Sequence, residues 1–262
     1  MEEGGGRERA MANTSQINKY YFDHPDVFEE VNRHRYDPEC EFLKGLFQAQ
    51  GGITHVLDAA CGTGAHAARL TQAGYAVTGV DLNPNMVAYA REHHPGLDFR
   101  LADMRDLPFN AAFEAVICLC TSFSYNRTNE EVVAALQSFR RALRGGGLLV
   151  IDVFNVITLI EKRPFLPERR EEEHYARLGL VSFWRSTVDE RRQLLVVQRT
   201  ISRVDSGEAL QTDLTEYRMF FPQELRYFLE TNGFKLLEFY SGFGLEQKNL
   251  EGSRLIAVAV RL

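Results

Sequence analysis

Residues 56–64 have the sequence VLDAACGTG, and the fold of this chain is predicted from them outward. A short apolar run leads into small residues and two glycines, and the helix-like segment AHAARL follows at residues 65–70. This order predicts a strand, a tight turn and a helix. Gly62 and Gly64 allow the backbone to turn sharply and to approach a ligand that a Cβ would obstruct, and the helix start offers free N–H groups. We therefore expect a polar ligand at this turn.

The spacing Gly62-x-Gly64-x-x-Ala67 satisfies the loose glycine fingerprint of dinucleotide-binding turns, and on its own it fits NAD, FAD or S-adenosylmethionine. Asp81 ends the next predicted strand, where the hydroxyl groups of a ribose would arrive. One carboxylate can accept hydrogen bonds from both hydroxyls of a vicinal diol. Asp81 is therefore a candidate ribose ligand. The alternative is that it caps the helix opened by Pro84.

A third strand is predicted at residues 97–101, and Asp103 follows it closely. An acid at this position could accept a hydrogen bond from the amino group of an adenine. Met86 and Met104 offer soft apolar surface that could close over the adenine ring. The alternative for both methionines is that they fill the core.

Strands and helices alternate over roughly the first half of the chain, which is typical of a doubly wound sheet. The chain is therefore predicted to be an α/β protein with a Rossmann-like, seven-stranded, mostly parallel sheet and an antiparallel β insertion after the fifth strand. Nearly continuous apolar runs predict two strands buried on both faces. The predicted later elements are strands at residues 113–120 and 148–153, a meander of strands at 181–188, 194–204 and 210–221, a helix at 222–232, and strands at 235–240 and 254–260.

The domain organisation follows from these elements. Residues 1–13 have no apolar period and are expected to be a disordered leader. Residues 14–262 are expected to form one domain with an N-terminal helical cap at residues 14–50 and a lid-like insertion at about residues 155–221. The cap should hold two helices, one around Tyr20 and one that opens at Pro38 with Asp37 as its cap.

Composition and charge narrow the partners. The chain has 262 residues, 45% of them hydrophobic, and a net charge of −6. This charge argues against a nucleic-acid binder that neutralises phosphates, so we expect a small-molecule substrate and no nucleic acid. No apolar run approaches the length needed to cross a bilayer, so no membrane partner is expected, and a homo-oligomer stays an open possibility. Four cysteines without CxxC spacing favour a reduced, cytoplasmic setting. Cys118 and Cys120 should lie on one face of a strand and pack in the core, so no metal is expected.

Four features now occur together and in order: the 56–64 stretch, Asp81, Asp103 and the turn GGGL at residues 145–148. With them the chain resembles the class I S-adenosylmethionine-dependent methyltransferases. The segments AVICL at 115–119 and GGLLVID at 146–152 resemble glycine N-methyltransferase. The 56–64 loop and DMRD at 103–106 also resemble the amino-sugar N,N-dimethyltransferases of antibiotic pathways. Both groups methylate amines.

The resemblance implies site residues. Arg35 matches the arginine that holds the methionyl carboxylate, Asn155 matches an asparagine that positions the substrate, and Tyr20 or Tyr21 matches a tyrosine beside the sulfonium. The residues expected to bind the cofactor are Tyr20, Arg35, Asp58, Ala59, Ala60, Cys61, Gly62, Gly64, Asp81, Leu82, Met86, Ala102, Asp103, Met104 and Leu119.

Methyl transfer from a sulfonium is an in-line displacement, so the protein chiefly has to align the acceptor, the methyl carbon and the sulfur. We expect Tyr21, Tyr125 and Asn155 to steer the acceptor amine, and His24 either to take its proton or simply to pack. Three alternatives stay open at this point: a C- or O-methyltransferase, an NAD-dependent oxidoreductase that uses the same glycine loop, and a cofactor-binding subunit without turnover.

Overall fold

The computed structural model describes residues 18–161 and 169–262, so the expected leader at residues 1–13 lies outside the described residues. The chain divides into two compact units. Unit 1 contains the described parts of residues 1–31 and 165–217, and unit 2 contains residues 32–164 and 218–262. The expected cofactor turn lies in unit 2. The expectation that the insertion acts as a lid stays a prediction.

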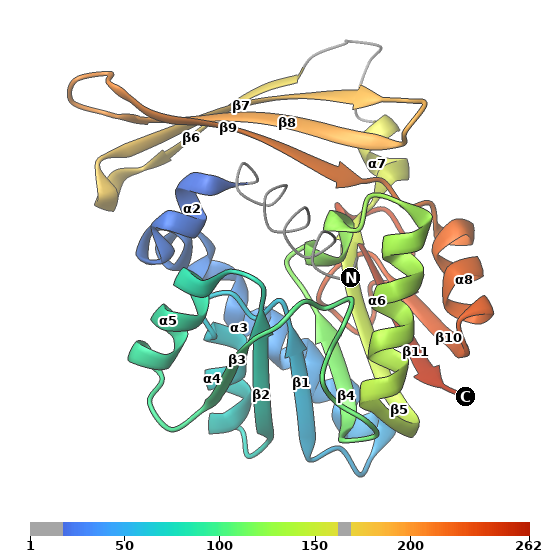
Figure 1. Cartoon of the computed structure of the whole chain (residues 1–262). Coiled ribbons are helices and arrows are strands. Elements are labelled where there is room, and N and C mark those ends of the chain that lie inside the picture. The colour runs from blue at the N-terminus through green and yellow to red at the C-terminus, as the bar shows by residue number, and fades with distance from the viewer. Residues whose placement is uncertain (1–17, 162–168) are drawn as a thin grey trace, which may run out of the picture. The chain divides into compact units, whose positions relative to one another are not determined.

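Unit 2 is built on a seven-stranded sheet in the order β10-β11-β5-β4-β1-β2-β3 (Figure 1). β11 runs antiparallel to both of its neighbours, and the other neighbouring pairs are parallel. This confirms the predicted doubly wound, mostly parallel sheet. The strands are β1 (His55–Ala59), β2 (Ala76–Asp81), β3 (Asp98–Leu101), β4 (Phe113–Cys118), β5 (Leu143–Phe154), β10 (Phe234–Tyr240) and β11 (Arg254–Arg261).

Helices accompany the strands of this sheet. No helix among the described residues is both long enough and apolar enough to cross a bilayer. The helices are α3 (Pro25–Gln50), α4 (Ala65–Gln72), α5 (Pro84–His93), α6 (Asn129–Ala142), α7 (Val156–Glu161) and α8 (Pro222–Thr231), with the 3₁₀ turn η1 (Ser122–Tyr125) after β4.

The central strands are mostly apolar, in keeping with a sheet that is covered on both faces. Successive side chains of a strand point to opposite faces. Val56 and Ile117 therefore join one buried cluster with residues of α3, α4 and α5. Their neighbours Leu57 and Val116 join a second cluster with residues of α6 and α8. These two layers hold the strand ends, and with them the cofactor turn, at one edge of the sheet.

Helix α6 shows how the sequence specifies these elements locally. The Thr128 side chain accepts a hydrogen bond from the Glu131 N–H, and the Glu131 carboxylate accepts one from the Thr128 N–H, which makes a capping box. Val132, Leu136 and Phe139 recur at helical spacing and are fully buried. The helix therefore starts at a defined residue and presents one apolar face to the sheet.

The start of α3, the second of the two predicted N-terminal helices, was predicted wrongly. α3 begins at Pro25 and continues through Pro38, so Asp37 lies inside the helix instead of capping it. Proline removes a hydrogen bond to the carbonyl four residues earlier, here that of His34. Both His34 and Pro38 are exposed, so water can reach the side of the helix where this bond is lost. Asp37 instead accepts a hydrogen bond from Arg69 Nε at 2.7 Å.

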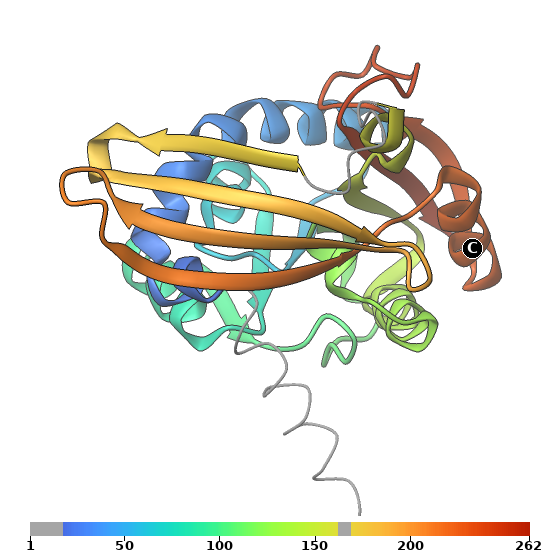
Figure 2. The same cartoon turned by 90° about the horizontal axis from the view of Figure 1, so that it is seen from above.

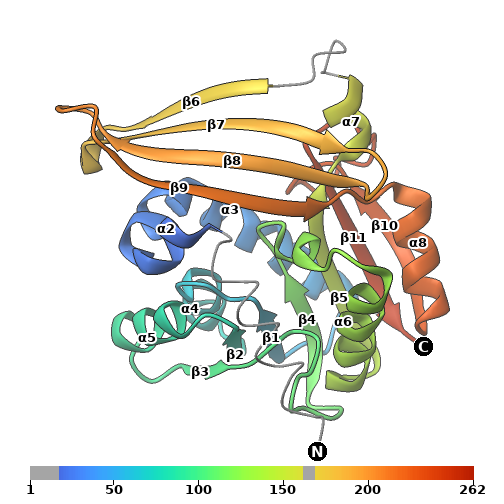
Figure 3. The same ribbon diagram turned by 45° about the horizontal axis from the view of Figure 1, so that its top comes forward.

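Unit 1 contains a separate antiparallel sheet of four strands in sequential order, drawn side by side from above in Figure 2 and labelled in Figure 3. Three of these strands were predicted. β6 was missed because its sequence, RREEEHY, has no apolar alternation. The elements are α2 (Lys19–Asp23), β6 (Arg169–Tyr175), the 3₁₀ turn η2 (Ala176–Leu178), β7 (Leu180–Asp189), β8 (Leu194–Arg203) and β9 (Ala209–Arg218).

The packing of α6 on the sheet can be tested with Phe139→Ala. Phe139 is fully buried, and its ring centroid lies 6.1 Å from that of Phe123. Removing the ring should lower the free energy of unfolding by about 3–5 kcal/mol, measured by urea denaturation. Tyr227→Ala on α8, where the side chain is 65% exposed, is the control and should change it by less than about 0.5 kcal/mol. Equal losses in the two variants would contradict the assigned core.

Candidate functional site

The turn after β1 has a sharply bent backbone. Ala60, Gly62 and Gly64 all have positive φ, at 64°, 54° and 80°. The Cys61 N–H donates to the Val80 carbonyl at 2.9 Å, and the Gly64 N–H donates to the Cys61 carbonyl at 3.0 Å. α4 begins immediately after Gly64. Free N–H groups at this helix start therefore lie at the carboxyl end of β1, where ligands of doubly wound sheets bind.

Gly64 is required at this turn by packing as well as by its φ angle. A Cβ on Gly64 would lie 2.5 Å from Phe99 Cζ, and one on Gly79 would lie 2.6 Å from Phe99 Cδ1. The Phe99 side chain on β3 is buried. Its ring thus occupies the space that the two glycines leave open, so no larger residue fits without displacing β3.

Asp81 binds the turn directly. Its Oδ2 accepts a hydrogen bond from the Gly62 N–H at 2.8 Å, and its Oδ1 accepts one from the Asn83 N–H at 2.8 Å. Burial raises the pKa of Asp81, and the backbone N–H donors oppose that rise. The cap of α5 is Asn83, whose Oδ1 accepts from the N–H groups of Asn85 and Met86. The alternative interpretation of Asp81 as the helix cap is therefore wrong.

Two buried polar atoms near the turn have no hydrogen-bond partner among the described residues: Asp58 Oδ2, at the end of β1, and Arg35 Nη2, on α3. Asp58 is 2% exposed, and burial raises its pKa from an ordinary value of 3.8 to about 6. An unpaired acceptor suits an ammonium group and an unpaired donor suits a carboxylate, and an α-amino acid carries both groups. The methionyl end of S-adenosylmethionine carries this pair of groups.

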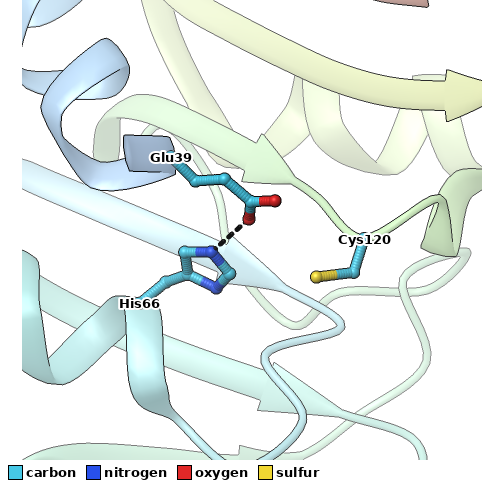
Figure 4. A group of neighbouring side chains, drawn as sticks. All are labelled: Glu39, His66 and Cys120. Atoms are coloured by element: carbon cyan, nitrogen blue, oxygen red, sulfur yellow. Dashed lines mark hydrogen bonds and ion pairs between the residues drawn. The ribbon is translucent and has the colours of Figure 1, made fainter. Parts of the chain in front are cut away.

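Arg35 is bound to a polar cluster that the sequence did not reveal. Its Nε donates to Glu39 Oε1 at 3.0 Å, and Glu39 Oε2 lies 2.7 Å from His66 Nε2 (Figure 4). Cys120 lies beside the pair, with its ligating atom within 4.8 Å of theirs. Burial opposes ionisation of Glu39, but the hydrogen bond from His66 and the charge of Arg35 hold its pKa below the usual value.

Glutamate, histidine and cysteine are also residues that zinc takes as ligands. Two ligands of a tetrahedral zinc lie roughly 3.3 Å apart, whereas Glu39 and His66 are at hydrogen-bond distance. Burial raises the pKa of the Cys120 thiol to about 12. The geometry is therefore that of a hydrogen-bonded pair. Cys120 also lies beyond the end of β4 with a φ of 54°, so the prediction that it shares a strand face with Cys118 was wrong.

Asp152, on β5, is a third buried carboxylate. Its Oδ2 accepts from Arg254 Nη1 at 3.0 Å and from the Thr121 N–H at 3.2 Å, while its Oδ1 has no partner within the part of the chain that is described. Burial raises the pKa of Asp152, and Arg254 and Arg35 oppose the rise. The α3 side of the sheet therefore holds two arginines and three carboxylates in a region with little access to water.

The remaining expected cofactor residues also lie in unit 2, except Tyr20. Leu82 follows β2, Ala102 follows β3 and Leu119 follows β4, each just past the carboxyl end of its strand. Both carboxylate oxygens of Asp103 already accept from the Arg105 guanidinium, at 2.7–3.0 Å. Met86 is 1% exposed and Met104 is half-buried. Cofactor binding by these side chains stays a prediction.

The four candidate catalytic residues are divided between the units. Tyr21 and His24 lie in unit 1. The Tyr21 hydroxyl is 3.1 Å from that of Tyr175, and the centroid of the His24 ring is 4.4 Å from that of the tilted Tyr20 ring. Tyr125 lies in η1 of unit 2.

Asn155 is 1% exposed. Its Nδ2 donates to the Leu250 and Gly252 carbonyls, so this amide group anchors the segment before β11. The catalytic roles of all four candidate residues stay predictions.

Sequence reasoning missed Glu39, His66, Asp152 and Arg254. One signal was present in the sequence. Arg35 and Glu39 are four residues apart, the spacing of an ion pair on one helix face. His66 is the second residue of α4 and is 5% exposed, a position that needs a polar partner. The pairing of Asp152 with Arg254 could be predicted only with the knowledge that β11 lies beside β5.

Comparison with known proteins gives these features a class. Residues 56–147 match the family model described as "Methyltransferase domain". YqeM of Bacillus subtilis (strain 168), itself named only as a candidate methyltransferase, is 29% identical over 87% of this chain and 92% of its own length. Human glycine N-methyltransferase is 37% identical over 42% of this chain and 44% of its own length. The dTDP-3-amino-3,4,6-trideoxy-alpha-D-glucopyranose N,N-dimethyltransferase of Streptomyces venezuelae is 32% identical over 51% of this chain and 58% of its own length. The chain thus spans about half the length of these last two relatives.

Solved structures extend the likeness of the fold to nearly the whole chain. An S-adenosylmethionine-dependent methyltransferase from Clostridium acetobutylicum has a TM-score of 0.78 at 16% identity and covers 92% of this chain and 98% of its own. CalS10, an amino pentose methyltransferase from Micromonospora echinaspora solved with S-adenosylmethionine bound, has a TM-score of 0.70 at 22% identity and covers 90% of this chain and 97% of its own. The fold is that of the class I cofactor-binding α/β enzymes. Residues 56–147 thus match a methyltransferase domain, and the fold around them is one that solved S-adenosylmethionine-dependent methyltransferases share.

The raised pKa of Asp58 has a consequence for stability. The folded protein holds this proton more tightly than the unfolded chain does, so the free energy of unfolding should fall as the pH rises from about 4 to about 6, by at most about 3 kcal/mol. Asp58→Asn should remove this contribution. Urea denaturation of both proteins at pH 4 and pH 7 should show the variant gaining stability relative to the wild type at the higher pH. Parallel pH dependence of the two proteins would contradict the burial argument.

Proposed function

We propose that the protein transfers a methyl group from S-adenosylmethionine to an amine nitrogen of a small molecule. The observation that supports an amine is the shared chemistry of the relatives, because the human and Streptomyces venezuelae enzymes are both named as N-methyltransferases. A sugar N-methyltransferase from Streptoalloteichus also has the same fold, with a TM-score of 0.73. An amino acid, an amino sugar or a related natural-product intermediate is the proposed class of acceptor.

The bound cofactor supplies a methyl group that is already activated on a sulfonium. Arg35 Nη2 would hold the methionyl carboxylate and Asp58 Oδ2 the methionyl ammonium, which satisfies both unpaired atoms. Asp81 would accept the ribose hydroxyls and Asp103 the adenine amino group. The protein then has to fix the acceptor in line with the methyl carbon, and such alignment can lower a barrier by up to about 7–11 kcal/mol.

The acceptor amine needs a free lone pair. We assign Tyr21, Tyr125 and Asn155 to steering it, with His24 as a candidate for accepting its proton. The Oδ1 atom of Asn155 supports this role, since it is buried and finds no partner within the described chain. Its Nδ2 is committed to the backbone carbonyls before β11, so Oδ1 is the atom that is left to accept from an amine.

The function can be tested by incubating the purified protein with S-adenosylmethionine and a panel of amines, phenols and carbon nucleophiles. Production of S-adenosylhomocysteine with an amine, and a product mass increased by one or more methyl groups, would support the proposal. Turnover only with phenols or carbon nucleophiles would identify an O- or C-methyltransferase. Binding of the donor without any product across the panel would favour a subunit without turnover.

The ribose role of Asp81 predicts a specific loss. Asp81→Ala should weaken binding of S-adenosylhomocysteine by about 1–3 kcal/mol in calorimetry, because a half-buried carboxylate acceptor is lost. Asp98→Ala is the control, since this acid lies on β3, is 43% exposed and pairs with Arg100. The free energy of S-adenosylhomocysteine binding to Asp98→Ala should stay within about 0.5 kcal/mol of the wild-type value. Unchanged affinity in Asp81→Ala would remove this carboxylate from the cofactor site.

A further inference from the structure

Glu39 is a carboxylate that the cofactor assignment does not use. It lies on α3 with a side chain that is 2% exposed, and it faces His66, on α4, as Figure 4 shows. Both of its oxygens are engaged, Oε1 by Arg35 Nε at 3.0 Å and Oε2 by His66 Nε2 at 2.7 Å. A buried carboxylate that is fully hydrogen-bonded in this way has a fixed position, so it can fix the position of its partner.

Arg35 is held at two of its three nitrogens. Nε donates to Glu39 and Nη1 donates to Asn32 Oδ1 at 3.2 Å. Because the guanidinium is planar, these two contacts also determine the direction in which Nη2 donates. Nη2 is buried, and none of the described residues accepts from it. The arrangement therefore presents one oriented donor to a ligand.

We propose that Glu39 and His66 are positioning residues for Arg35. His66 fixes the Glu39 carboxylate, and Glu39 fixes the guanidinium so that Nη2 meets the carboxylate of the methionyl end of the donor. The pair thereby sets how strongly the protein distinguishes ligands that carry this amino-acid end from ligands that lack it. This inference rests on the proposed role of Arg35 in donor binding.

The charges around the pair agree with a positioning role. Glu39 carries one negative charge between Arg35 and His66, so the ligand carboxylate would meet a guanidinium whose charge is already partly balanced. Without Glu39, the guanidinium would lose a rigid acceptor and could turn toward Asp152, which contributes electrostatically to Arg35. The proposal therefore requires that the affinity for the methionyl carboxylate depend on the orientation of the Arg35 guanidinium as well as on its charge.

The test compares two ligands that share the adenosine part. S-adenosylhomocysteine carries the amino-acid end, and 5′-methylthioadenosine lacks it. Glu39→Gln and His66→Ala should each weaken S-adenosylhomocysteine by about tenfold in calorimetry, the scale of one charge-assisted hydrogen bond, and change 5′-methylthioadenosine by less than about twofold. His66→Gln keeps an N–H donor and should restore most of the lost affinity. Glu41→Gln, 70% exposed on the same helix, is the matched control and should bind both ligands as the wild type does.

Further measurements separate the possible failures. Arg35→Ala in combination with Glu39→Gln should bind S-adenosylhomocysteine no more weakly than Arg35→Ala alone, because the pair acts only through Arg35. If Glu39→Gln weakens both ligands equally, the pair has a general structural role and the inference is overturned. If Arg35→Ala does not distinguish the ligands, the proposed carboxylate site itself fails. A thiolate-to-cobalt absorption band on titration with Co²⁺, lost in Cys120→Ser, would overturn the inference in favour of a metal site.

Discussion

The contact between the Phe99 ring and the two glycines Gly64 and Gly79 is the constraint on which the site depends. The ring fills the space where either Cβ would lie, at 2.5–2.6 Å from its carbon atoms. β3, β2 and the turn after β1 are therefore packed against one another through a single side chain. This packing supports the turn, to which the Asp81 carboxylate is hydrogen-bonded through the Gly62 N–H. The glycines thus serve the protein interior as well as the ligand.

The site also depends on buried carboxylates on the α3 side of the sheet. Asp58, Asp152 and Glu39 are nearly inaccessible to water, and burial of an unpaired charge costs several kcal/mol. The protein offsets this cost in different ways. Glu39 has two hydrogen-bond donors and a lowered pKa, whereas Asp58 keeps an unpaired oxygen and a raised pKa. The acid with satisfied oxygens is suited to fixing a neighbour, and the acid with an unpaired oxygen is suited to receiving a cation.

The sequence predicted the parallel sheet because its signals are local. Apolar runs such as residues 113–118 mark strands that are covered on both faces, and Gly62 with Gly64 marks the turn. The errors arose where the tertiary environment of a segment overrides its local sequence signal. Pro38 marks a helix start by itself, but the exposed side of a helix tolerates it, and the charged β6 forms a strand because β7 offers it an edge. Asn83 was overlooked as a cap because Asp81, two residues earlier, fits the same rule.

The buried cluster of Arg35, Glu39, His66, Asp152 and Arg254 was not predictable from single residues, because its members come from four elements, α3, α4, β5 and β11, that are distant in the chain. Arg35 and His66 are 31 positions apart, yet both contact the same carboxylate. A buried donor or acceptor without a partner costs about 1–3 kcal/mol, so Arg35 Nη2 and Asp58 Oδ2 lower the stability of the ligand-free protein. A ligand with a carboxylate and an ammonium at matching positions removes both costs at once. A ligand that carries only one of these groups leaves the other atom unpaired. Under the proposed donor binding, the same two atoms that weaken the fold would favour a ligand with an amino-acid end over a simpler nucleoside.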